Sequence, residues 1–144
     1  MLEGSLIASF NAVTRQVAQS VLLTVSFIVA ACGRQDQRLH QHHQKLESLA
    51  SSAAAIGNAW LSGSTSGTYT ITALEQTYLL VETERAEMAG TPDALVDPRG
   101  AELSQSAERL SRVLAAMRYD VRGSNASSVR QQLREIAGLV AERR

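Results

Sequence analysis

The sequence predicts an all-α protein: an antiparallel up-down four-helix bundle, preceded by an N-terminal apolar helix that serves as a signal or membrane anchor. Only two prolines interrupt the 144 residues and aromatic residues make up 4%, which favours helices over a strand-rich fold. Apolar residues recur at spacings of three and four from residue 39 onward. We therefore expect residues 1–31 to form the signal or anchor and residues 32–144 to form the helical domain.

The N-terminal element centres on an uncharged run of eleven residues, 21–31, in which Thr24 and Ser26 are the polar members. Its length fits the apolar region of a secretory signal, about 7–15 residues, better than a spanning helix of about 20. Extending the run toward the N-terminus would bury Arg15 in hydrocarbon, at a cost of about 2.5 kcal/mol or more. A removable signal is therefore favoured; a retained anchor and a core helix of a soluble protein are the alternatives.

Four segments after Arg34 carry apolar seams of heptad type, which require partner helices. The first is expected to run from about residue 35 to residue 61. The expected seams are Leu39, His42, Leu46, Leu49, Ala53, Ile56 and Trp60; Ile71, Leu74, Tyr78, Val81, Arg85 and Met88; Leu103, Ala107, Leu110, Leu114, Met117 and Val121; and Val129, Leu133, Ile136 and Val140.

The connections between these segments are short and carry turn and capping residues. The glycine- and serine-rich stretch 62–68 predicts a turn, and Thr72 with Glu75 three residues later suggests a capping box. Asp97 followed by Pro98 is typical of an N-cap and a first helical position. The stretch 122–127 is expected to close the third helix and cap the fourth. Short connections make consecutive helices antiparallel neighbours.

The charges are balanced overall but unevenly placed. Residues 75–108 hold eight acids and two arginines, whereas residues 109–144 hold eight arginines and three acids. We expect acidic and basic helices to lie side by side; a basic surface for anionic lipid headgroups or an acidic partner is the alternative. Zero net charge argues against a nucleic-acid-binding protein.

One candidate metal site is the pair His40 and His43, which share a helical face with Glu47 one turn further on. Two imidazoles and a carboxylate can ligate zinc or copper. However, a metal site inside a bundle usually draws ligands from several helices, and the chain's three histidines all lie in one short stretch. A solvated polar surface is therefore the favoured interpretation, with no metal.

Small residues fill the stretch 50–60 and would allow close helix approach. Alternatively, they leave a groove for an apolar ligand, lined by Trp60, Tyr69 and Tyr78. Arg85, on an otherwise apolar seam, is expected to reach solvent or pair with a neighbouring acid.

Sequence motifs for catalysis are missing: there is no HExxH, no GxSxG, no phosphate-binding glycine loop and no CxxCH. The single cysteine excludes an internal disulfide framework. The sequence therefore predicts that the chain is not an enzyme and has no cofactor.

The residues Val29, Ala30, Ala31 and Cys32 resemble the lipobox of bacterial lipoproteins, in which an aliphatic residue and two small residues precede a cysteine. The resemblance implies that Cys32 receives a lipid and that the signal is removed before it. It implies a cell-envelope lipoprotein, anchored in the membrane and facing the periplasm.

On this basis we expect a non-catalytic accessory or structural protein that acts through helix-mediated contacts with a protein partner. One alternative is a single-span accessory subunit of a membrane protein complex, with the N-terminal helix retained. The other is a periplasmic metal- or small-ligand-binding helical module.

Overall fold

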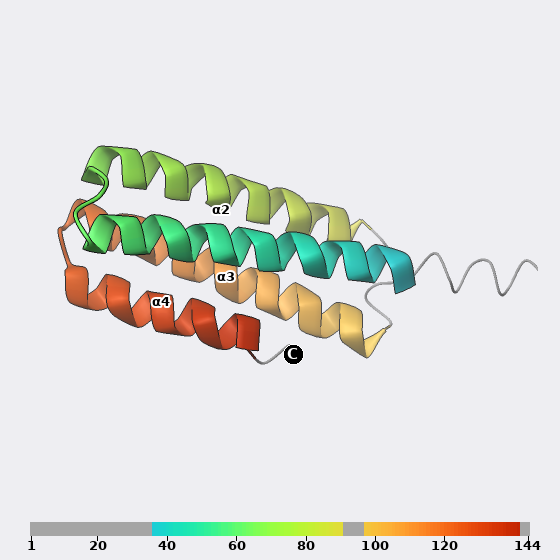
Figure 1. Cartoon of the computed structure of the whole chain (residues 1–144). Coiled ribbons are helices and arrows are strands. Elements are labelled where there is room, and N and C mark those ends of the chain that lie inside the picture. Colours follow the sequence, from blue (N-terminus) through green and yellow to red (C-terminus); the bar gives the residue numbers. More distant parts are fainter. Residues whose placement is uncertain (1–35, 91–96, 142–144) are drawn as a thin grey trace, which may run out of the picture. The chain divides into compact units, whose positions relative to one another are not determined.

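The computed structural model describes residues 36–90 and 97–141, and within these ranges it contains four helices and no strand (Figure 1). The first helix covers residues 36–61 and is followed by α2 (Gly67–Ala89), α3 (Pro98–Arg122) and α4 (Ala126–Ala141). The prediction of an all-α bundle is confirmed. The predicted signal or anchor, including Cys32, lies outside the described residues.

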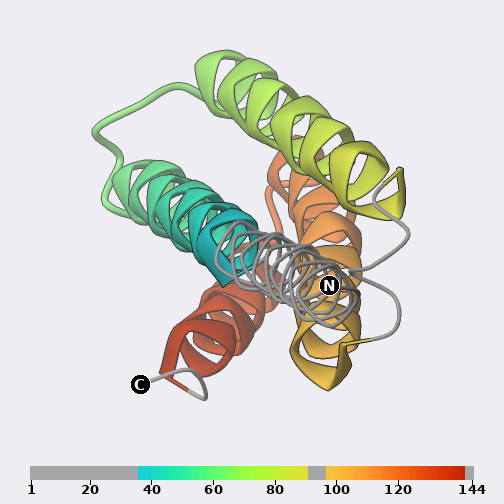
Figure 2. The same ribbon diagram turned by 90° about the vertical axis from the view of Figure 1, so that its right-hand side faces the viewer.

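The chain divides into two units, Met1–Arg38 and Leu39–Arg144, and from Leu39 onward the helices described here pack within the second. Helix α3 contacts both α2 and α4. The helix of residues 36–61 lies on the other side of the core, next to α2 and α4 (Figure 2). The four helices therefore surround one core, and each has two neighbours.

The core consists mainly of leucine, alanine, valine and methionine, and no aromatic residue is among its largest fully buried side chains. The seam predicted for the third segment is buried throughout. In the first and fourth segments, some of the predicted seam residues are buried and the others are half-buried. The fully buried side chains with the largest volumes are Leu46, Leu74, Leu114, Met117, Ile136, Val81, Val129 and Thr70.

Small residues bring the first helix close to the two C-terminal helices. Ala53 is fully buried, and a Cβ atom placed on Gly57 would lie 3.0 Å from Leu133 Cδ2 and 3.3 Å from Met117 Sδ. Such separations are tighter than ordinary van der Waals contact, so a side chain at position 57 would displace its neighbours.

Helix α2 begins earlier than the predicted capping box. Ser66 is its N-cap, and the Ser66 hydroxyl accepts a hydrogen bond from the Tyr69 backbone N–H at 3.2 Å. The capping-box prediction for Thr72 and Glu75 is wrong, because the chain becomes helical as soon as Ser66 supplies a cap. Thr72 lies inside the helix, and its hydroxyl donates to the Thr68 carbonyl.

Threonine hydroxyls along α2 bond back to their own helix. Each donates to the carbonyl oxygen four residues earlier, at 2.9–3.1 Å. This is a common way for a threonine inside a helix to satisfy its hydroxyl group. The threonines that do so are Thr70, Thr72, Thr77 and Thr83.

The ends of α3 agree with the sequence prediction. Asp97 is the N-cap, Pro98 occupies the first turn, and the Arg99 backbone N–H donates to Asp97 Oδ1 at 2.9 Å. At the other end Ser124 takes a positive φ of 55°, and Asn125 Oδ1 accepts from the Ser128 backbone N–H at 3.3 Å. The stretch 122–127 thus closes α3 and caps α4, as predicted.

Among the residues that the structure describes, every helix falls short of the length or the apolar content needed to span a bilayer. The predicted apolar run of residues 21–31 is outside the described ranges.

Two leucines of α2 test the orientation of this helix. Leu74 is fully buried, so Leu74→Ala should lower the free energy of unfolding by about 2–5 kcal/mol through lost burial and a residual cavity. Leu79 is 48% exposed, and Leu79→Ala should change the free energy of unfolding by about 0.5 kcal/mol or less. Urea denaturation of both variants measures the difference. Equal losses would show that α2 faces the core differently.

Candidate functional site

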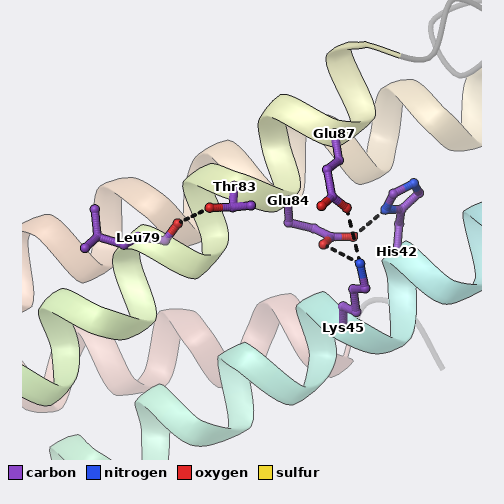
Figure 3. Close-up of polar contacts among 6 residues, drawn as sticks. All are labelled: His42, Lys45, Leu79, Thr83, Glu84 and Glu87. Atoms are coloured by element: carbon purple, nitrogen blue, oxygen red, sulfur yellow. Dashed lines mark hydrogen bonds and ion pairs between the residues drawn. The ribbon is translucent and has the colours of Figure 1, made fainter.

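The principal cluster of titratable side chains lies between the first helix and α2 (Figure 3). His42 and Lys45 come from the first helix, and Glu84 and Glu87 come from α2. Each pair is separated by three positions, which places its two side chains on one face of a helix. The two helices therefore present two basic and two acidic groups to one another.

Glu84 is the centre of this cluster because its side chain is only 6% exposed. One carboxylate oxygen, Oε1, accepts a hydrogen bond from His42 Nδ1, and the other, Oε2, accepts from Lys45 Nζ at 3.0 Å. An ionised carboxylate is costly to bury unless it is paired and hydrogen-bonded. Both Glu84 oxygens meet this requirement.

Lys45 Nζ also donates to Glu87 Oε2, at 3.2 Å, so its ammonium group bridges the two carboxylates (Figure 3). The hydrogen bonds to Glu84 and then Glu87 raise the pKa of Lys45 above its ordinary value of 10.5. Lys45 and Glu87 are each about half exposed, at 54% and 51%. The cluster is therefore buried at Glu84 and open to solvent at Glu87.

The two histidines that the sequence suggested as metal ligands, His40 and His43, lie outside this cluster. His40 is exposed, and its Nε2 accepts a hydrogen bond from Gln44 Nε2 at 3.0 Å. His43 is half-buried beside a different, mainly apolar pocket, which Glu47 also lines. Within the described ranges, the one group of three or more potential metal ligands consists of His42, Glu84 and Glu87, whose ligand atoms all lie within 4.8 Å of one another.

Sequence reasoning missed this group for a specific reason. His42 and Glu84 are 42 positions apart, and their contact depends on how the two helices pair. The seam prediction for α2 also placed Arg85 at the position that Glu84 takes, and this was wrong: Glu84 is buried, whereas Arg85 is half-buried. The available signal was the three-residue spacing of His42 with Lys45 and of Glu84 with Glu87.

The three aromatic residues predicted to line a groove lie in different surroundings. Tyr69 is 63% exposed, and Trp60 is half-buried near Gly67. Tyr78 is half-buried below the Arg118 guanidinium, which lies 5.5 Å from the ring centroid. The aromatic groove stays a prediction.

Two polar contacts join α2 to α3. Arg118 of α3 forms an ion pair with Glu75 of α2, as expected for acidic and basic helices that lie side by side. The Ser111 hydroxyl donates to Glu82, which also pairs with Arg85 at 2.7 Å. The Ser111 hydrogen bond, followed by the Arg85 contacts, lowers the pKa of Glu82 below its ordinary value of 4.5. Arg85 thus pairs with a neighbouring acid, as predicted.

No protein-family model, no curated protein and no solved structure matches the chain.

His42→Ala tests whether Glu84 depends on its histidine partner. We expect the free energy of unfolding to fall by about 1–3 kcal/mol, because a buried carboxylate oxygen loses its donor. Glu87→Gln, at a half-exposed position, should cost about 1 kcal/mol or less. Replacing both partners by apolar residues, in His42→Leu/Glu84→Leu, should recover most of the loss. A double variant less stable than His42→Ala in urea denaturation would contradict this account.

Ser111→Ala tests the Glu82 contact through its pH dependence. A carboxyl group with a lowered pKa contributes stability above its unfolded value, here about 4.5, and that contribution is lost as the pH falls through the lower folded value. Ser111→Ala should therefore cost about 1 kcal/mol at pH 7 and clearly less at pH 3. Urea denaturation at both pH values measures the difference, with the exposed Ser52→Ala as the control. The same cost at both pH values would refute the assignment.

Proposed function

We propose that the chain is a lipid-anchored cell-envelope protein that acts as a non-catalytic accessory or structural component through contacts between its helices and a partner protein. The observation that carries this proposal is the outward face of α2. This face exposes Tyr69, Leu79 and Leu80 by 63%, 48% and 56% of their surfaces.

The outward face of α2 is uncharged over most of its length. A surface helix of a bundle normally has a charged or polar face opposite its apolar seam, but α2 shows almost no such contrast. Large apolar side chains gathered on one exposed face are typical of protein contact sites. The exposed positions from the start of the helix to Thr83 are Thr68, Tyr69, Thr72, Gln76, Leu79, Leu80 and Thr83.

Leu80 extends this face toward the first helix. It lines a shallow hollow together with Leu49, and the charged residues Lys45, Glu84 and Glu87 line the same hollow. A partner helix with an apolar stripe would cover Leu79 and Leu80 and place its next turn over Leu49. The partner in this proposal is accordingly a protein with an amphipathic helix, and neither a nucleic acid nor a catalytic cofactor is involved.

The anchor in this proposal is a lipid on Cys32, after removal of residues 1–31, with the domain of residues 32–144 facing the periplasm. The lipobox-like sequence supports it. We further propose the antiparallel up-down arrangement for the four helices. His42 near the start of the first helix contacts Glu84 near the end of α2, and Glu75 in the first half of α2 pairs with Arg118 near the end of α3.

The main alternative is a single-span accessory subunit of a membrane complex, with the N-terminal helix retained. Intact-protein mass spectrometry on material extracted from native membranes separates the two. A chain that starts at Cys32 and carries added acyl mass supports the lipoprotein proposal. A chain that starts at Met1 without lipid overturns it in favour of the retained helix.

Site-specific photo-crosslinking tests the contact face. With the crosslinking residue at position 79 or 80, we expect one discrete adduct with a partner protein in intact cells. At Arg134, an exposed position on α4, we expect none. A Leu79→Glu substitution should abolish the adduct formed from position 80, since a charge in an apolar interface is costly to bury. Equal adducts from positions 80 and 134, or none from α2, would contradict the proposal.

A further inference from the structure

We propose that His42, Glu84 and Glu87 form a binding site for a divalent transition-metal ion, and that the ion takes the place of the Lys45 ammonium between the two carboxylates. This site differs from the pair His40 and His43 that the sequence suggested. It does not depend on the anchor, and it borders the hollow beside Leu80, which Glu84 and Glu87 also line.

The donor atoms are of the right kind and come from two helices. One imidazole nitrogen and two carboxylate oxygens, all within 4.8 Å of one another, converge on one point. Zinc and similar ions are bound by this combination, often with three protein ligands and an open position for water. Magnesium and calcium prefer six or more oxygen ligands, so the imidazole favours a transition metal.

The geometry requires only small adjustments. Bonds of about 2.0–2.2 Å in a tetrahedral site place ligand atoms roughly 3.3–3.6 Å apart. His42 Nδ1 and Glu84 Oε1 are in direct contact, so they would separate slightly as the ion enters, and Nδ1 would give up its proton so that the imidazole binds the ion as a neutral ligand that carries its proton on Nε2. Glu87 would move toward the ion, which it can do because its side chain is half exposed. Glu84, which is buried, supplies the fixed ligand.

Lys45 lies beside the position that the ion would take, and it holds the carboxylates that the ion would bind. Its ammonium lies 3.0 Å from Glu84 and 3.2 Å from Glu87, bridging the two acids (Figure 3). The Lys45 side chain is 54% exposed on a flexible stem, so it can turn into solvent when an ion binds.

This exchange has a consequence for affinity. Lys45 competes with the ion, so its removal should strengthen binding, whereas removal of any of the three ligands should weaken it. An ion bound to both helices would also hold the first helix against α2. Binding should therefore raise the unfolding temperature in proportion to the logarithm of free metal concentration above the dissociation constant.

The test uses the full chain without an affinity tag, in a non-ionic detergent, titrated with cobalt(II) alone and then with zinc(II) as competitor. Visible absorption of cobalt reports a low-symmetry nitrogen and oxygen site directly. We expect one equivalent to bind and zinc to displace it. The His40→Ala/His43→Ala variant is the matched control and should bind as the unmodified chain does.

The variants give the decisive comparison. Because Glu87 is half exposed, Glu87→Gln should keep the fold while weakening binding about tenfold or more, and His42→Ala should weaken it at least as much. Lys45→Met should tighten binding severalfold. The proposal is overturned if cobalt shows no saturable binding, if the His40→Ala/His43→Ala variant loses binding, or if Glu87→Gln and Lys45→Met leave the affinity unchanged.

Discussion

The close approach of its helices is the constraint on which this structure depends. No aromatic residue is among the largest fully buried side chains, so the core side chains fill only a narrow space between the helices. The helices must therefore lie near one another to exclude water. Gly57 shows how near, because even a methyl group there would press on Leu133 and Met117. The shape of the core and the contacts at its surface, including the pairing of Glu84 with the first helix, follow from this spacing.

The buried carboxylate of Glu84 is the one strongly polar feature that this close packing admits at the seam of α2. A leucine there would pack without needing partners, whereas a carboxylate needs donors at defined positions on the neighbouring helix. His42 and Lys45 supply them. The pairing of the first helix with α2 is thereby tied to one register, since a shift of one helix along the other would break the present arrangement of these two donors around Glu84.

The helices and several of their ends could be predicted from local patterns, because periodicity and capping act over a few residues. The seam of α3 and the Asp97–Pro98 cap are examples. The start of α2 could not be predicted in this way. Ser66 and Thr72 are both acceptable N-cap residues, and only the folded turn selects between them. The candidate site could not be predicted from local patterns either. The rotation of α2 about its axis decides whether Glu84 or Arg85 enters the core, and a rotation by one residue position replaces an acid by a base.

The threonines of α2 have a consequence for how this helix meets its surroundings. Their hydroxyl groups are bonded to backbone carbonyls of the preceding turn, so the methyl group is the part of each side chain left for outside contact. Inside the bundle, Thr70 and Thr77 pack much as valines would. Outside it, Thr83 offers a methyl group one turn from Leu79 and Leu80, and Thr72 offers another two turns before Leu79. A hydropathy scale that scores threonine as polar therefore underestimates how poorly water wets this side of the molecule.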